Sequence, residues 1–190
     1  MNSNILSTAI ILTTLWLQAS GNALNPGHLE QLRQTGSCVG CNLSSAQFPD
    51  ALLSNTDLRE ANLTGANLIR ADLRRANLAD ANLAAASLIN ANLSGANLTN
   101  SNLQVASLIR AKLIGANLAG AHLSQAKLPS ADLRGADLRG TDLRTTDLSN
   151  ANLSSADLRG ADLRNADLDN AILTNAQMKK AIMPDGSLSP

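Results

Sequence analysis

The residues best suited to chemistry in this sequence are two cysteines, Cys38 and Cys41, which are separated by two other residues. Such a pair can be a redox site, half of a zinc site or a haem attachment. Haem attachment is excluded because Asn42 stands where that motif requires a histidine. A zinc site needs further ligands, and His28 and His122 are too few and too scattered to provide them. We therefore expect no metal and no other cofactor.

The cysteine pair lies at the start of a long periodic segment and shares its register. Cys38 occupies a position equivalent to leucine in the repeat, and Cys41 a position equivalent to alanine, so both side chains are expected to face inward. In an oxidising compartment such a pair is expected to form a structural disulfide that links the N-terminal segment to the first repeats. A switchable thiol pair and unpaired cysteines are the alternatives.

Groups for acid–base or nucleophilic catalysis are sparse. The two histidines are distant from each other, and no nucleophile stands beside a base. No glycine-rich phosphate loop is present, because the glycines follow the repeat. The aspartates recur at outward positions of a filled rod, where no cleft excludes water and shifts their pKa values. We therefore expect that the protein is not an enzyme.

The element that must position all of these residues is the segment from Cys41 to Met183, which repeats Ala-(Asn/Asp)-Leu-x-x 29 times without insertion or deletion. A fixed short period indicates a solenoid. On an α-helix, successive leucines would step about 140° around the axis, and on a strand they would alternate between faces. The period is satisfied if each pentapeptide forms one short side and then turns a corner, with alanine and leucine inside. The coils would then stack about 4.8 Å apart.

These repeats resemble the pentapeptide-repeat family, and the resemblance covers residues 41–183. It implies an all-β fold, a right-handed quadrilateral (four-sided) parallel β-helix with four repeats per coil. The recurrence of Ile69, Ile89 and Ile109 every 20 residues agrees with that coil length. The repeats would then form about seven coils and a rod roughly 35 Å long.

The first 23 residues differ from the rest of the chain. Ile5–Leu17 is apolar apart from small hydroxyl residues, and small residues suited to cleavage follow it up to Ala23. We interpret residues 1–23 as a signal peptide, although no Lys or Arg precedes the apolar run. About 13 apolar residues are too few to span a bilayer comfortably, so a membrane anchor is the minor alternative. The run from Leu32 to Ala46 also resembles the leader of cyanobacterial pentapeptide-repeat proteins, which implies the periplasm or the thylakoid lumen.

Three further segments follow the expected signal peptide. Residues 24–37 are predicted to form a short capping helix whose leucines, Leu29 and Leu32, cover the first coil. Residues 38–186 form the β-helix, and residues 187–190 are a C-terminal tail. The last coil is expected to be thinly covered, because only a short tail with Pro and Gly follows it.

The outward positions suggest one candidate partner surface. Stacked isoleucines on one side, with a fourth around the next corner, would form an exposed aliphatic strip: Ile69, Ile89, Ile109 and Ile114. The alternative is that these side chains only pack against one another and stabilise the stack. Residues 131–169, rich in Asp-Leu-Arg, are expected to form a solvated face of lateral ion pairs.

The overall charge balance limits the functions that the family resemblance offers. The chain has 15 basic and 15 acidic side chains, whereas the acidic members of the family that imitate DNA and bind DNA gyrase need a strong negative field. We expect a non-enzymatic structural or protein-interaction module, exported to the periplasm or thylakoid lumen. The alternatives are a DNA-mimicking, gyrase-binding protein and a redox-switched lumenal factor that uses Cys38 and Cys41. We expect an unidentified protein partner, no nucleic acid, no stable membrane insertion after signal removal, and a monomer.

Overall fold

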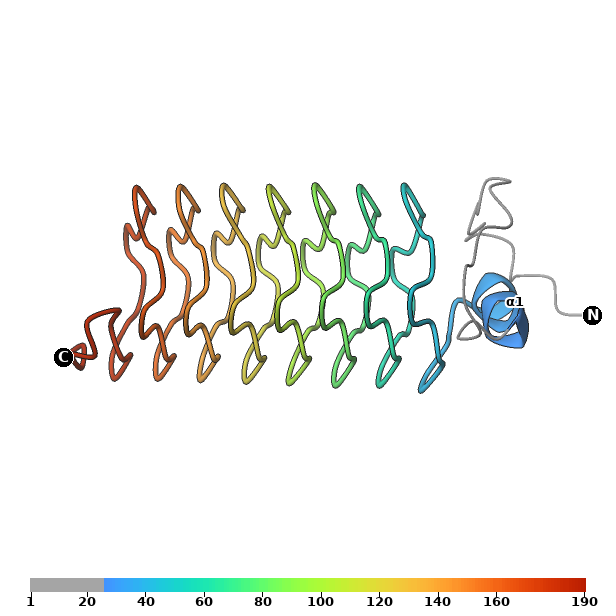
Figure 1. The fold of residues 1–190 in the computed structure, drawn as a ribbon, viewed down its shortest axis with the longest axis horizontal. Helices are drawn as coiled ribbons and strands as arrows, with labels where there is room; N and C mark the ends of the chain where they lie inside the picture. The colour runs from blue at the N-terminus through green and yellow to red at the C-terminus, as the bar shows by residue number, and fades with distance from the viewer. Residues whose placement is uncertain (1–25) are drawn as a thin grey trace, which may run out of the picture.

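The computed structural model of the protein describes residues 26–190. The expected signal peptide, residues 1–23, lies outside the described residues. One helix, α1 (Pro26–Thr35), is followed by a long stack of short parallel bridges (Figure 1). Within residues 26–190, no helix is long and apolar enough to cross a membrane.

The stack is built from coils of 20 residues. Each bridge joins a residue to the one 20 positions later, in parallel orientation, as in Asn42 with Asn62 and Gln47 with Asn67. The bridges recur every five residues, so one coil has four sides. We call the sides A, B, C and D, starting in the first coil with residues 41–45, 46–50, 51–55 and 56–60.

Backbone hydrogen bonds fix the distance between coils. On side A the Leu43 N–H donates to the Asn62 carbonyl at 2.7 Å, and the Asn62 N–H donates back to the Cys41 carbonyl at 2.8 Å. Each corner is a β-turn, in which the Ala46 N–H donates to the Leu43 carbonyl at 3.1 Å. The third turn residue, Ser45, has φ of 57°, as a type II turn requires. This geometry explains why Gly, Asn, Asp and Ser are frequent at the fifth position of the repeat.

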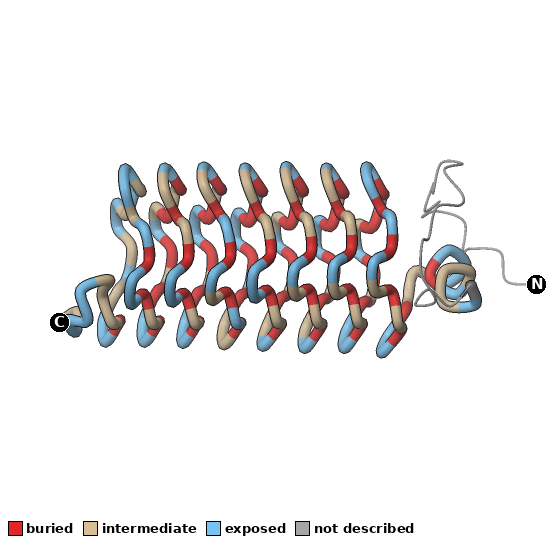
Figure 2. The backbone as a smooth tube through the Cα atoms, in the orientation of Figure 1, coloured by how far each residue is buried: buried red, intermediate tan, exposed pale blue. Residues whose placement is uncertain are grey.

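The core is a continuous column of leucine and alanine along the rod axis (Figure 2). The repeat leucines from Leu43 to Leu163 and most of the repeat alanines are buried. Four hydroxyl residues replace alanine without leaving a buried polar atom unpaired. For example, the Thr56 Oγ1 donates to the Leu53 carbonyl at 2.7 Å, and the Thr141 Oγ1 donates to the Leu118 carbonyl of the preceding coil at 3.0 Å.

Helix α1 lies at the N-terminal end of the stack (Figure 1). Leu32 is fully buried in the core cluster, and Leu29 packs against that cluster. The helix also supplies a hydrogen-bond acceptor to the first coil, because the Asn42 N–H donates to the His28 Nδ1 at 3.1 Å. In later coils the equivalent N–H donates to a carbonyl of the preceding coil, so the His28 imidazole replaces a carbonyl that the first coil lacks.

The C-terminal end is covered on one side only. The chain turns back after Met183, and Leu188 forms an antiparallel bridge with Ile182 on side A. The Ser189 N–H donates to the Ala181 carbonyl at 2.8 Å. The expectation of a bare tail is therefore wrong for side A.

Sides B, C and D of the last coil have no such cover. Five backbone N–H groups that point away from the stack have no hydrogen-bond partner among residues 26–190: those of Leu168, Asn170, Leu173, Asn175 and Met178. The core side chains of this coil, such as Leu168 and Leu173, are only partly buried. These three sides form an open β-edge.

Candidate functional surface

Side B carries the three isoleucines of the predicted strip, one above the other. The Arg70 N–H donates to the Ile89 carbonyl and the Asn90 N–H to the Ile109 carbonyl, both at 2.9 Å, so the side chains stack at the coil spacing. A proline continues the stack at each end. We call this set the aliphatic column: Pro49, Ile69, Ile89, Ile109 and Pro129.

The aliphatic column is less exposed than the sequence suggests. Ile69, Ile89 and Ile109 are half-buried, because each isoleucine covers part of its neighbours in the adjacent coils. Ile114 does not belong to the column. It lies on side C and is 37% exposed. The structure therefore gathers three of the four predicted residues on one face and places the fourth around the corner.

Sequence reasoning missed Val105, which is the most exposed large apolar residue of the middle coils, at 56%. It occupies the corner between sides A and B in the same coil as Ile109 and Ile114. Its φ is 61°, which is unfavourable for a β-branched side chain. The signal was available in the sequence, because valine is unusual at the fifth position, where Gly, Asn and Ser recur.

Three basic residues border this apolar area without an ion pair. Arg110 follows Ile109 at the corner between sides B and C, Lys112 lies on side C, and Lys127 lies on side B one coil later. All three side chains are exposed, and within residues 26–190 none has a carboxylate within 4.0 Å. We call them the unpaired cations. Lys112 acts on Asp132 of the next coil only through space, where it is a minor cause of a lowered pKa.

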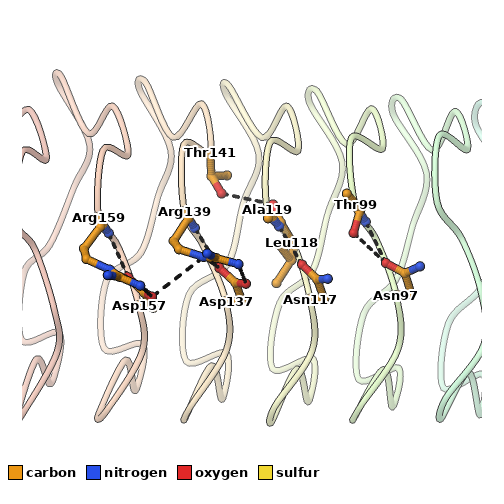
Figure 3. A network of polar contacts seen from close by, with 10 residues as sticks. All are labelled: Asn97, Thr99, Asn117, Leu118, Ala119, Asp137, Arg139, Thr141, Asp157 and Arg159. Atoms are coloured by element: carbon orange, nitrogen blue, oxygen red, sulfur yellow. Dashed lines mark hydrogen bonds and ion pairs between the residues drawn. The ribbon is translucent and has the colours of Figure 1, made fainter.

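Side D shows how most of the other arginines are neutralised (Figure 3). In the coils without charge, the Asn97 Oδ1 accepts hydrogen bonds from the N–H and hydroxyl of Thr99. Where aspartate replaces asparagine, the same oxygen accepts the N–H of the residue two positions later, and that residue is an arginine. The Asp137 carboxylate thus also binds the Arg139 guanidinium, at 2.8 and 2.6 Å.

This pairing keeps the aspartates ionised. The hydrogen bond from the Arg139 side chain holds the pKa of Asp137 below its usual value, and Arg144 does the same for Asp142. Adjacent coils add longer contacts, as from the Arg139 Nε to the Asp157 Oδ2 at 3.8 Å. The ion pairs therefore form within one repeat first and between coils second. A carboxylate with a lowered pKa is a poor general acid near neutral pH.

The two cysteines lie where the first coil meets helix α1. Their Sγ atoms form a disulfide, and both side chains are buried, at 0% exposure for Cys38 and 3% for Cys41. His28, on the helix, contacts Asn42 directly after this pair. His122 is far along the rod on side A. In the described part of the chain, no group of three or more His, Cys, Asp or Glu side chains is placed to hold a metal ion.

Comparison with known proteins agrees with the resemblance described above. Residues 37–75, 76–104, 106–144 and 146–183 match the profile of the pentapeptide repeats, in eight copies. No curated protein matches the chain.

Several solved structures are similar. HetL, a pentapeptide repeat protein involved in heterocyst differentiation regulation in the cyanobacterium Nostoc sp. strain PCC 7120, is 30% identical, with 87% of this chain and 100% of that chain covered and a TM-score of 0.32. Rfr23 from the cyanobacterium Cyanothece 51142 is 27% identical, with 83% and 97% covered and a TM-score of 0.37. A pentapeptide repeat protein of the Arabidopsis thaliana thylakoid lumen is 32% identical, with 52% and 65% covered and a TM-score of 0.40. This last match spans less than two thirds of the Arabidopsis protein.

Proposed function

Because the chain belongs to the pentapeptide-repeat family, we propose that it is a non-enzymatic interaction module that binds a partner protein through the outer faces of a right-handed, four-sided rod. The observation that carries this proposal is the aliphatic column on side B. A rigid face with stacked apolar side chains can bury them against a partner without reorganising, which lowers the cost of association.

The chemistry of the outer surface supports binding over catalysis. The aspartates of the Asp-Leu-Arg repeats are held ionised by arginines two positions later, as in Asp157 with Arg159. Their role is to neutralise and order the surface around a filled core. An interaction module needs such a surface, whereas acid–base catalysis needs a group that can exchange its proton near the working pH.

We further propose that the protein works outside the cytoplasm, in the periplasm or the thylakoid lumen. The disulfide between Cys38 and Cys41 supports this location, because disulfides persist in oxidising compartments. N-terminal sequencing of the protein recovered from the exported fraction is expected to start directly after Ala23. Recovery of an intact Met1 in the cytoplasmic fraction would contradict the export proposal.

The binding proposal is tested with the protein immobilised on beads and exposed to an extract of its own cells. The variant Ile69→Ser/Ile89→Ser/Ile109→Ser is expected to lose the captured partner while keeping the β-type circular dichroism spectrum. The matched control changes half-buried positions of side D, Ala79→Ser and Ala119→Ser, and is expected to keep the partner. Equal capture by all three proteins would show that side B is not the binding face.

A further inference from the structure

The charges of the rod are segregated along its axis although they cancel over the whole chain. Residues 26–80 carry six acidic and five basic side chains, and residues 132–190 carry nine acidic and seven basic side chains. Residues 81–131 carry three basic side chains and no acidic one. The three are the unpaired cations, so the middle of the rod is positive and both ends are slightly negative.

The unpaired cations lie beside the apolar side chains of the same coils. Arg110 directly follows Ile109 of the aliphatic column, and Lys112 lies on side C, two positions before the exposed Ile114. Lys127 shares side B with the column, one coil beyond Ser107. Most other arginines of the rod are occupied by an aspartate two residues earlier, as in Arg134 with Asp132. Only around this area do exposed apolar groups and free positive charge coincide in the described residues.

We propose that this middle face, the aliphatic column together with the unpaired cations, docks an acidic polypeptide segment that carries aliphatic side chains. The proposal rests on the proposed function and names the chemistry of its partner. Aliphatic groups of the segment cover the column, and its carboxylates meet Arg110, Lys112 and Lys127. The arginine matters most, because its planar guanidinium binds a carboxylate through two hydrogen bonds and tolerates partial burial.

The observations favour an acidic polypeptide over other anionic partners. A duplex nucleic acid gains its affinity from many phosphate contacts, and three cations on two coils supply few of them. A lipid surface needs apolar side chains that reach the acyl region. The isoleucines of the column are half-buried in their own stack, so they cannot extend that far. A peptide chain can approach the column closely and satisfy both kinds of group at once.

The test uses the full-length protein and a fluorescein-labelled synthetic peptide of alternating glutamate and leucine, with binding measured by fluorescence anisotropy. The variant Arg110→Gln/Lys112→Gln/Lys127→Gln is expected to weaken binding by about tenfold or more and to reduce its salt dependence. The matched control, Arg139→Gln/Arg144→Gln/Arg159→Gln, removes the same total charge from arginines that are already paired. It is expected to change the affinity by less than about twofold. Circular dichroism confirms that each variant is folded.

Each outcome decides the proposal. Equal weakening by the two triple variants would overturn it, because only the net charge would then matter. Tighter binding of the wild type to phosphatidylglycerol vesicles or to duplex DNA than to the peptide would also overturn it. Failure of this inference is distinct from failure of the proposed function. If the isoleucine variant loses the cellular partner while the cation variant retains it, the binding face stands and the acidic chemistry of its partner is wrong.

Discussion

At the scale of single residues, the corner position of the repeat imposes the clearest local constraint. From Ser45 to Lys180 every fifth residue has a positive φ between 55° and 70°, whether or not it is glycine. Glycine adopts this conformation without steric cost, asparagine tolerates it, and a β-branched residue does not. Val105, with φ of 61°, therefore stores strain in the middle of the rod.

We predict that Val105→Asn stabilises the protein by about 1 kcal/mol, because it relieves this strain while leaving the core unchanged. The free energy of unfolding in urea measures the effect. The reciprocal control is Gly95→Val, where φ is 67° and the added Cβ meets only the Arg75 Cγ at 3.6 Å, an ordinary contact. It is expected to destabilise by a similar amount. If Val105→Asn lowers stability, the exposed valine contributes packing that outweighs its backbone strain.

The inward positions give a prediction of the opposite kind, since they are already filled. Leu98 is fully buried, and Leu98→Ala is expected to cost about 2–5 kcal/mol through the cavity that it leaves. Ala96, on the same side of the same coil, is 1% exposed, and Ala96→Leu is expected to cost roughly 1–3 kcal/mol by overpacking. Urea denaturation measures both changes. A tolerated Ala96→Leu would mean that the column of alanines leaves free space.

At the scale of elements, helix α1 and the disulfide close the N-terminal coil together. The bond joins Cys38 and Cys41 across only two residues, so it constrains the unfolded chain little and acts mainly on this junction. The hydrogen bond from the Asn42 N–H to His28 lies next to it. We predict that mild reductant speeds hydrogen exchange at the Asn42 amide while the Asn102 amide stays protected, because repeat stability is approximately local. Loss of the whole β-type spectrum would show that the junction controls the entire rod.

The Asp–Arg pairs of the last coils give an element-scale dependence on pH. The pKa values of Asp132, Asp137, Asp142, Asp157 and Asp162 are lowered in the folded protein, first by hydrogen bonds from the following arginines. Groups with a lowered folded pKa contribute stability above the unfolded pKa and lose it as the pH falls through the folded value. We therefore expect the free energy of unfolding to be nearly flat between about pH 5 and 8 and to fall below about pH 4.

The variant Asp137→Asn/Asp157→Asn tests this dependence. Asparagine retains the turn hydrogen bond, as Asn97 shows in an uncharged coil, but it does not titrate. The loss of stability below about pH 4 is expected to be smaller in this variant than in the wild type. An identical acid loss in both proteins would place the titrating groups elsewhere.

At the scale of the whole molecule, the repeat predicted the positions of nearly all side chains. The inward alanines and leucines are buried, and residues pair at an offset of 20, because a strict period leaves each side chain only one register. The candidate surface was predicted only in part. Ile69, Ile89 and Ile109 share one face, but their partial burial depends on neighbours in adjacent coils, which a linear pattern does not measure.

Non-repeating segments were the least predictable. The hydrogen bond of His28 and the return of the tail to Ile182 depend on the exact place where the stack ends. No periodicity specifies such contacts. Ile182 and Leu188 offered only a short apolar spacing around Pro184 and Gly186, which is typical of a turn but does not show that the tail pairs with the last coil.

The C-terminal end determines whether the rod associates with a second copy. Five unpaired N–H groups on sides B, C and D offer an edge for strand addition, and Ile172 is exposed there. The tail on side A opposes flush stacking, because it occupies the place of a further coil. Lys179 and Lys180 add positive charge at the corner of side D, which also protects an edge.

We predict that the full-length protein is a monomer at micromolar concentration in sedimentation experiments. Deleting residues 184–190 is expected to produce concentration-dependent dimers, because the fourth side then becomes an open edge as well. Lys179→Ala/Lys180→Ala is expected to give weaker dimers that appear at high salt. A tight dimer of the unmodified chain would show that neither the tail nor the lysines guard this end, and that the open edge of the last coil is itself an interface between two copies.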